Sequence, residues 1–323
     1  MQDLKWRRAW LIWLGLSLWG LPLAQAQVYV STEKDHQITV LSADGVLQKT
    51  IAVCKRPRHM AWVEGQKKIL VACGESDSLG LVDVDSGQVL GQIPTGESPE
   101  MFALSPDGRT AYVSIEESSE LEAVDLATRK KAFSVKTGAE PEGVLVSPDG
   151  RLVYVTSEVA NAVHVVDVVS RKVVAQIRVG KRPRRMALSV DGKELWVSLE
   201  LGSALAVVDV ASRSLKQTIA LEMQGMRKGD ITPVGLALAP DGKSFWVGLG
   251  RANHVAQVDA QSKAVKKTVL VGKRAWGLAF NKDGSRLYVA NGLSDDVSVV
   301  DVVGGKALKS TPVGRVPHSI LVK

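Results

Sequence analysis

The chain has 323 residues and a formal net charge of +7, with 45% hydrophobic and 23% charged residues. This balance is typical of a globular protein and excludes a disordered or collagen-like chain. The two cysteines, Cys54 and Cys73, are too few for a disulfide-rich scaffold. Neither lies in a Cys-x-x-Cys motif, which excludes a thioredoxin-type site and covalent heme attachment.

The first 26 residues have the layout of a secretory signal peptide. Three basic residues precede an uncharged apolar stretch from Ala9 to Leu23, and Ala24-Gln-Ala26 supplies small residues before a cleavage point. The apolar stretch has 15 residues, short of the roughly 20 that span a bilayer, and an uncleaved anchor is the alternative. Cleavage leaves residues 27–323 with a net charge of +5, and we expect them in the periplasm or outside the cell.

The rest of the chain is a series of repeats. A strand element that reads Tyr-Val or Trp-Val in six of seven units, and a second element that ends in Val-Asp in six of seven, both recur at steps of 41, 42, 42, 42, 50 and 42 residues. The valine of the first element lies at Val30, Val71, Val113, Val155, Val197, Val247 and Val289. The second element ends at Ser42, Asp83, Asp125, Asp167, Asp209, Asp259 and Asp301. We expect these aspartates to bond turn amides, a structural role.

Each repeat unit predicts four short strands. In the fourth unit the strands are expected at Gly143–Ser147, Leu152–Thr156, Val163–Asp167 and Val173–Val179, and a Pro-Asp-Gly turn joins the first two. Proline and glycine favour such a tight turn because they supply its backbone angles. Seven units of four antiparallel strands predict an all-β fold, a seven-bladed β-propeller.

The two ends of the repeat region are complementary. The region begins with the second strand of a repeat unit, at Val28–Ser31, and ends with the first strand of a unit, at His318–Val322. We therefore expect the last strand to complete the first blade, which closes the ring and leaves no open edge. Residues 27–323 would then form one propeller domain.

The repeats resemble a known family. Tyr112-Val-Ser, Tyr154-Val-Thr and Tyr288-Val-Ala-Asn, with their Pro-Asp-Gly turns, look like the YVTN-repeat β-propellers. The segments that begin at Val28 and Ile231 look most like the periplasmic seven-bladed proteins associated with PQQ-dependent alcohol catabolism. That resemblance implies a partner from an alcohol oxidation system: a dehydrogenase, a cytochrome or a transport component.

The linkers between blades contain the candidate binding residues. The position after the linker proline varies in charge from blade to blade, which is unexpected for a purely structural residue. It is occupied by Arg58, Glu100, Glu142, Arg184, Val234, Trp276 and His318. The residue before the proline position adds Arg56, Arg182 and Arg274. Since propeller linkers converge on the central channel, we expect a ring around the channel mouth that binds a partner or a small anion. Solvated linker charges are the alternative.

Two further features lie in linkers. The 50-residue step marks an eight-residue insertion within Glu222–Pro233. Long loops often carry recognition, and here the contacts to a partner would come from Met223, Met226, Arg227 and Lys228. An insertion that is merely tolerated is the alternative.

Cys54 and Cys73 lie near one end of the second blade. An oxidising compartment would allow a disulfide between them, and two separate buried thiols are the alternative.

No catalytic motif stands out in the sequence. The sequence has no Gly-x-Ser-x-Gly nucleophile elbow, no His-Glu-x-x-His zinc motif and no Walker phosphate-binding loop. Its five histidines are scattered, so we predict no metal site and no cofactor. Tryptophan-docking repeats, which PQQ enzymes carry, are also missing. The favoured function is a non-catalytic periplasmic binding or scaffolding propeller.

Two other functions stay open. The first is a lactonase-like hydrolase that uses His318, Glu100, Glu142 and the arginines at the channel mouth. The second is a nucleic-acid-binding YVTN propeller. The basic net charge suggests the second, but export and a cluster of acidic residues on blades two to four argue against it.

Overall fold

The computed structural model describes residues 26–63 and 65–323. The predicted signal peptide, except for its last residue, lies outside the described residues. No helix in the described part of the chain is long and apolar enough to cross a membrane.

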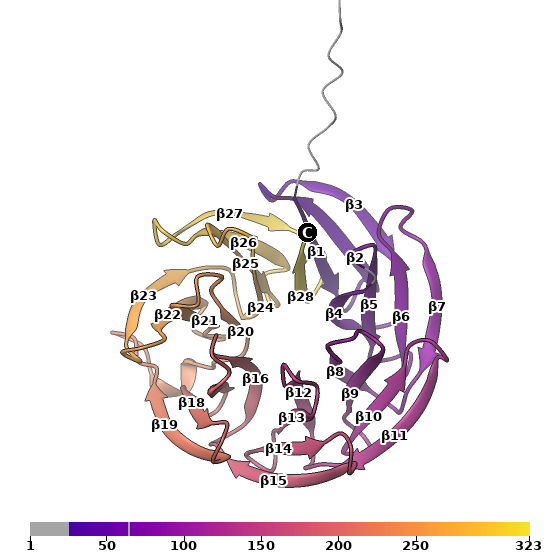
Figure 1. Ribbon diagram of the computed structural model, residues 1–323. Coiled ribbons are helices and arrows are strands. Elements are labelled where there is room, and N and C mark those ends of the chain that lie inside the picture. Colours follow the sequence, from indigo (N-terminus) through magenta and orange to yellow (C-terminus); the bar gives the residue numbers. More distant parts are fainter. Residues whose placement is uncertain (1–25, 64) are drawn as a thin grey trace, which may run out of the picture.

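The described chain forms seven four-stranded antiparallel sheets arranged as blades around a central channel (Figure 1). Blade 1 contains β28 (Pro317–Val322), β1 (Gln27–Thr32), β2 (Gln37–Ser42) and β3 (Leu47–Ala52). Blades 2 and 3 contain β4 (Pro57–Val63), β5 (Lys68–Cys73), β6 (Ser78–Asp83), β7 (Val89–Pro94), β8 (Pro99–Leu104), β9 (Thr110–Ile115), β10 (Glu120–Asp125) and β11 (Lys130–Lys136). Blades 4 and 5 contain β12 (Pro141–Val146), β13 (Leu152–Ser157), β14 (Ala162–Asp167), β15 (Lys172–Arg178), β16 (Pro183–Leu188), β17 (Glu194–Leu199), β18 (Ala204–Asp209) and β19 (Ser214–Ala220). Blades 6 and 7 contain β20 (Leu236–Leu238), β21 (Ser244–Gly248), β22 (His254–Asp259), β23 (Val265–Leu270), β24 (Ala275–Phe280), β25 (Arg286–Asn291), β26 (Asp296–Asp301) and β27 (Lys306–Pro312).

The ring closes as the sequence predicts. Strand β28 pairs antiparallel with β1, and Tyr29 lies opposite Leu321. The last strand therefore completes the blade that contains the first strand, and the seven-bladed all-β prediction is confirmed.

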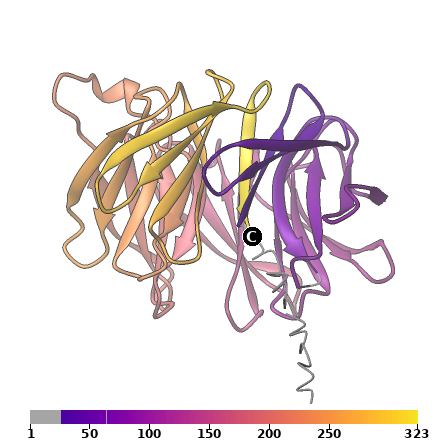
Figure 2. The same ribbon diagram turned by 90° about the horizontal axis from the view of Figure 1, so that it is seen from above.

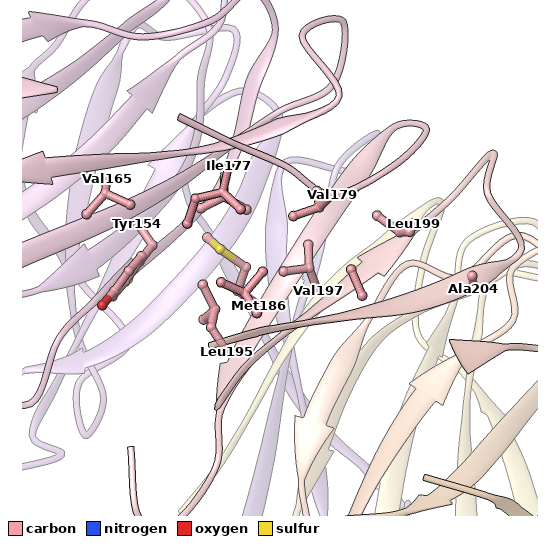
Figure 3. Packing of buried hydrophobic residues seen from close by; sticks show 12 residues of the cluster. Tyr154, Val165, Ile177, Val179, Met186, Leu195, Val197, Leu199 and Ala204 are labelled. Carbon is pink, nitrogen blue, oxygen red and sulfur yellow. The ribbon is translucent and has the colours of Figure 1, made fainter. Parts of the chain in front are cut away.

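Apolar side chains pack between neighbouring blades. Between blades 4 and 5, Tyr154, Ile177, Met186 and Val197 form one buried cluster (Figure 3). The middle two strands of each blade are buried on both faces because a blade lies on either side, and this is why they are rich in valine. Full burial of each such side chain contributes about 1.5–3 kcal/mol, so contacts between blades hold the ring together.

Turns on the face opposite the linkers follow the repeated sequence. In the fourth blade, Gly150 takes a φ of +71° in the Pro-Asp-Gly turn, a conformation that glycine adopts without steric cost. Asp167 accepts hydrogen bonds from the amide and hydroxyl of Ser170, both at 2.7 Å. Asp83, Asp125, Asp209 and Asp259 accept the same pair of bonds, and Asp301 accepts the amide bond from Gly304, which agrees with the structural role expected for them.

Cys54 and Cys73 are joined by a disulfide, with their Cα atoms 5.6 Å apart. The pairing of Pro57 with Cys73 at the start of blade 2 brings the linker cysteine back to the end of β5. The bond therefore attaches the linker from blade 1 to the second strand of blade 2.

Blade 6 departs from the other blades at its inner strand. Strand β20 has only three residues, whereas the other inner strands have six or seven. The insertion precedes it and contains a short 3-10 helix, η1 (Lys228–Asp230). This loop projects from one face of the disc (Figure 2).

Candidate functional site

The linkers between blades and the loop that follows the second strand of each blade lie on the same face of the disc. Each of these loops ends in a residue with a left-handed backbone, and in five blades its side chain accepts a hydrogen bond from the next linker. Asn161 Oδ1 accepts from the Arg182 amide at 2.9 Å, and His36 Nδ1 accepts from the Arg56 amide at 3.1 Å. The linker residue that donates also has a positive φ, 54° at Arg182 and 52° at Arg56. These paired left-handed residues direct the following linker side chains toward the channel.

A cavity of about 340 Å³ lies at the channel mouth. Nine of the residues singled out in the sequence line it: Arg56, Arg58, Glu100, Glu142, Arg182, Arg184, Arg274, Trp276 and His318. Six of these are the second residues of inner strands, whereas Arg56, Arg182 and Arg274 lie in linkers. Val234 does not line the cavity. The structure therefore brings these residues into one site, and their role in binding stays a prediction. The volume suits a small molecule.

The insertion residues lie elsewhere. Met223 packs against the core between blades 5 and 6, while Met226, Arg227 and Lys228 are exposed. None of the four lines the cavity, so the insertion is not part of this site.

A second set of carboxylates also reaches the site, and of these the sequence indicated only Glu116, as part of the acidic cluster on blades two to four. Glu33, Glu116 and Glu158 line the cavity, and Glu200 contacts its arginines. All four occupy the third position after the repeated strand valine. Because blades 2, 6 and 7 have glycine there, the glutamates form a blade-specific pattern that comparison of the repeats could have found.

Carboxylates and guanidinium groups alternate around the channel mouth. Arg58 contacts Glu100 through both terminal nitrogens, at 2.9 and 2.6 Å. Arg184 contacts Glu158 and lies 3.5 Å from Glu142. The ion pairs continue through the outer residues as Arg56–Glu33, Arg56–Glu100, Arg182–Glu158, Arg182–Glu200 and Arg274–Glu200. The arginines are therefore already paired with acids, and the site is not the anion cage that a ring of free arginines would make.

Trp276 is the aromatic wall of the cavity. Its ring lies 5.1 Å from the Arg184 guanidinium carbon, 4.7 Å from that of Arg274 and 5.6 Å from the His318 ring. Such cation–π contacts hold both guanidinium groups in place. The structure thus joins four residues from three segments of the chain, 184, 274–276 and 318, into one unit.

His318 is buried and uncharged. Its Nε2 atom lies 3.3 Å from Arg58 Nη2 and 3.4 Å from Arg185 Nη2. Since arginine can only donate, Nε2 accepts both bonds and the proton resides on Nδ1. Burial, together with the charges of Arg58 and Arg185, lowers the pKa of His318 well below its usual value.

The pKa values of the two central carboxyl groups, Glu100 and Glu142, are shifted in opposite directions. Burial, followed by the charge of Glu142, raises the pKa of Glu100 to about 8 against the opposing effect of Arg58. Burial also opposes ionisation of Glu142, but Arg184, Arg185 and Arg58 outweigh it and hold its pKa well below the usual value. Two carboxyl groups with separated pKa values are typical of acid–base sites.

A smaller cavity of about 140 Å³ lies on the inner-strand side of the same channel. His59, Arg185 and His318 line it together with apolar side chains. The two histidines therefore share this cavity, but no cluster of three or more histidine, cysteine or acidic side chains suited to a metal occurs within residues 26–63 and 65–323.

Solved structures of similar fold include three with high coverage. The periplasmic gluconolactonase of Pseudomonas aeruginosa has a TM-score of 0.79 at 21% identity, over 93% of this chain and 99% of that one. A putative 6-phosphogluconolactonase of Bacteroides uniformis has a TM-score of 0.77 at 15% identity, over 93% and 99%. Hydrazine synthase of Kuenenia stuttgartiensis has 0.76 at 22%, over 85% and 92%. At these identities the similarity shows the fold alone.

Two family models match the sequence, whereas no curated protein does. The YNCE-like β-propeller model matches residues 92–188. The cytochrome D1 heme domain model matches residues 142–322, more than half of the chain. The protein therefore belongs to the cytochrome D1 heme domain family of β-propellers, and its central region also resembles the YNCE-like propellers.

Proposed function

We propose that the channel mouth hydrolyses a sugar-acid lactone. The observation that carries the proposal is Glu100, a carboxyl group with a pKa of about 8 that is held against Arg58 in a cavity large enough for a small ligand. A general base is most effective when its pKa lies near the working pH. The similarity in fold to a gluconolactonase and a putative 6-phosphogluconolactonase supports this choice of reaction.

Unpaired donors around the cavity favour an oxygen-rich ligand. Arg58 Nε, Arg184 Nε and Trp276 Nε1 are buried and have no hydrogen-bond partner within the described part of the chain. Each belongs to a residue that lines the cavity. A buried donor without a partner costs about 1–3 kcal/mol, so a ligand with several hydroxyl or carbonyl oxygens would gain by accepting from them. A sugar-acid lactone has such oxygens.

The reaction needs one base and one stabilised oxyanion. Ionised Glu100 takes a proton from a water molecule, and the water oxygen attacks the lactone carbonyl carbon. Arg58 and Arg56, which lie next to Glu100, stabilise the oxyanion through charged hydrogen bonds. When the ring C–O bond breaks, the leaving oxygen takes the proton back from Glu100. Glu142 stays ionised and holds the arginines in position.

The side chains at the channel mouth do not fit the heme that the family name suggests. Proteins hold heme iron through a histidine nitrogen, a cysteine or methionine sulfur, or a tyrosine oxygen. Among the described residues that line this cavity there is no cysteine, methionine or tyrosine. His318 is the one histidine among the described residues that lines this cavity, and its Nε2 lone pair already accepts from Arg58 and Arg185. Its other ring nitrogen carries the proton. We therefore assign no step to a heme.

Substitution of Glu100 by glutamine tests the proposal. We expect wild-type protein to open an aldonolactone with a rate that rises with pH through an apparent pKa near 8, because Glu100 must be ionised. Glu100→Gln should lower kcat at least about 100-fold, the usual contribution of a general base. The exposed Glu117 on the same face provides the control, and Glu117→Gln should leave kcat unchanged. Equal activity of Glu100→Gln and wild type would rule out Glu100 as the base.

The sequence resemblance supports a competing function, the docking of a periplasmic protein from an alcohol oxidation system. The exposed charges on the channel-mouth face favour such docking, because complementary charges raise encounter rates. Absence of lactone turnover by the wild type, together with capture of a dehydrogenase, cytochrome or transport component from cells grown on alcohol, would favour this function over hydrolysis.

A further inference from the structure

Exposed charges on the channel-mouth face are unevenly divided between two halves of the disc, although Lys55 lies in the mainly acidic half and Glu222 and Asp230 lie in the mainly basic half. Glu97, Glu117 and Glu140 lie on the half formed by blades 2 to 4, and they are exposed. Arg227, Lys228, Arg251 and Lys273 lie on the half formed by blades 5 to 7, and they are also exposed. None of the seven forms an ion pair with another residue in the described ranges. We call these seven side chains the outer rim. Unlike the channel mouth, where acids and bases alternate, the outer rim has one acidic and one basic half.

Two exposed apolar side chains lie at the boundary between the halves. Val159 of blade 4 is 60% exposed and Leu201 of blade 5 is 56% exposed. They occupy the same loop position in adjacent blades, four residues after the repeated strand valine. Together with Lys181 and Arg182 they border a shallow depression of about 320 Å³. Apolar side chains between charged ones are typical of the centre of a protein interface.

We propose that this face binds a second copy of the same chain, face to face. A two-fold axis that lies in the plane of the face and passes through blade 1 and the boundary of blades 4 and 5 exchanges blade 2 with 7, blade 3 with 6 and blade 4 with 5. Such an interface is isologous, since each patch meets its own complement on the other copy. The acidic half of each copy then lies over the basic half of the other.

The equivalent loop positions show how the charges match. Glu117 in blade 3 and Arg251 in blade 6 both lie four residues after the repeated strand valine, so the axis places each opposite the other. Glu97 and Lys273 hold the same position in linkers that the axis also exchanges.

The remaining linker and loop positions complete this match. Glu140 faces the insertion, where Arg227 and Lys228 would attract it and the exposed Glu222 and Asp230 would repel it. At the boundary between the halves, Val159 meets Leu201 of the other copy.

Some positions oppose the contact and limit its strength. Lys34 and Lys181 lie near the axis, and each faces the same residue of the other copy, while Lys55 faces Arg315. Arg315 is already paired with Asp35 at 2.7 Å, which reduces that repulsion. Because the favourable contacts are mostly exposed ion pairs, each contributes about 0.2–1 kcal/mol and is screened by salt. We therefore expect a weak dimer whose formation depends on ionic strength.

The dimer would turn the two channel mouths toward each other. The cavity lined by Glu100 and Trp276 opens on the same face as the outer rim, so association restricts its access to solvent. The dimer inference does not rest on lactone hydrolysis, because its test measures association alone.

Sedimentation velocity over a range of concentrations tests the dimer, on protein expressed with its own N-terminal segment. Arg251→Glu and Glu117→Arg should each weaken dimerisation at least about tenfold, because each pair occurs twice in the interface and attraction becomes repulsion. The double variant Glu117→Arg/Arg251→Glu should return the dissociation constant to within about threefold of wild type. A rise from roughly 0.05 to 0.5 M NaCl should weaken the wild-type dimer, since the Debye length becomes shorter.

Lys266→Glu serves as the matched control. Lys266 is exposed on β23, the outer strand of the same blade as Arg251, and its reversal makes the same change in net charge. It should leave dimerisation unchanged. A protein that stays monomeric at every concentration would overturn the proposal. So would a dimer that Arg251→Glu weakens no more than Lys266→Glu does, or one that the double variant fails to restore.

Discussion

At the scale of single residues, the channel combines histidines and arginines, of which His318 and Arg58 are buried and His59 and Arg185 are partly buried. His318 accepts hydrogen bonds from Arg58 and Arg185, and His59 packs edge-on against Phe102 with the ring centres 5.0 Å apart. A charged imidazole in either place would lose its hydration and be repelled by the neighbouring guanidinium groups. The channel therefore stabilises the neutral form of both histidines, and this makes the fold sensitive to acid.

Burial, followed by the charge of Arg185, lowers the pKa of His59 from 6.5 to about 3. Between these values the unfolded chain binds a proton that the folded chain does not, so the stability due to this group is complete above about pH 6.5 and is lost as pH falls toward 3. We expect His59→Gln to reduce the loss in unfolding free energy between pH 7 and pH 5 by about 1–2 kcal/mol. Urea denaturation of both proteins at the two pH values measures this, and equal losses would contradict the pKa shift.

At the scale of elements, the linkers control where the site residues point. Six of the seven linkers have a residue with a positive φ directly before the proline position, and at Val316 this residue is β-branched with a φ of 56°. Valine rarely adopts this conformation. The Val316 amide donates to Asp295 Oδ1 at 2.9 Å, and the next residues enter β28, which carries His318 into the channel. The strained linker is therefore maintained by the strand that follows it.

Deletion of residues 317–323 should destabilise the ring strongly. It removes β28, exposes the edge of β1, and uncovers part of the apolar cluster that contains Ile320 and Tyr288. Loss of several buried side chains costs several kcal/mol, and for a domain of this size each kcal/mol lowers Tm by roughly 2–4 °C. Scanning calorimetry should show a Tm at least about 10 °C lower, whereas removal of Lys323 alone should change it little. An unchanged Tm after the full deletion would contradict closure by β28.

At the scale of the whole molecule, the ion pairs of the channel mouth connect adjacent blades and, through Arg58 and Glu142, also connect blade 2 with blade 4. The alternating acids and arginines extend from Glu33 of blade 1 to Arg274 in the linker between blades 6 and 7. Glu142 lies at the centre, because it contacts Arg185 and is within 4.0 Å of Arg184 and Arg58. The network therefore acts on the ring as a unit, in addition to the contacts between adjacent blades.

Glu142→Gln should lower the unfolding free energy by roughly 3–5 kcal/mol, the usual loss when one partner of a buried ion pair is removed. Three guanidinium groups would lose their shared counter-charge, although glutamine keeps the shape of the side chain. Glu140 lies two residues earlier in the same linker and is exposed, so Glu140→Gln should stay within about 0.5 kcal/mol of wild type. Chemical denaturation measures both variants. Equal stability of the two would show that the network contributes nothing to folding.

The sequence by itself determined the propeller and the positions that surround its channel. Repeat spacing, turn residues and strand patterns are local properties, and they suffice to place β28 beside β1 and nine of the predicted site residues around one cavity. Only the tertiary structure decided which acid pairs with which arginine, that Glu33 and Glu158 join the site, and that the insertion does not. These outcomes depend on distances between side chains of different blades. The neutral state of His318 follows for the same reason, because two guanidinium groups from separate inner strands meet one imidazole nitrogen only in the closed ring.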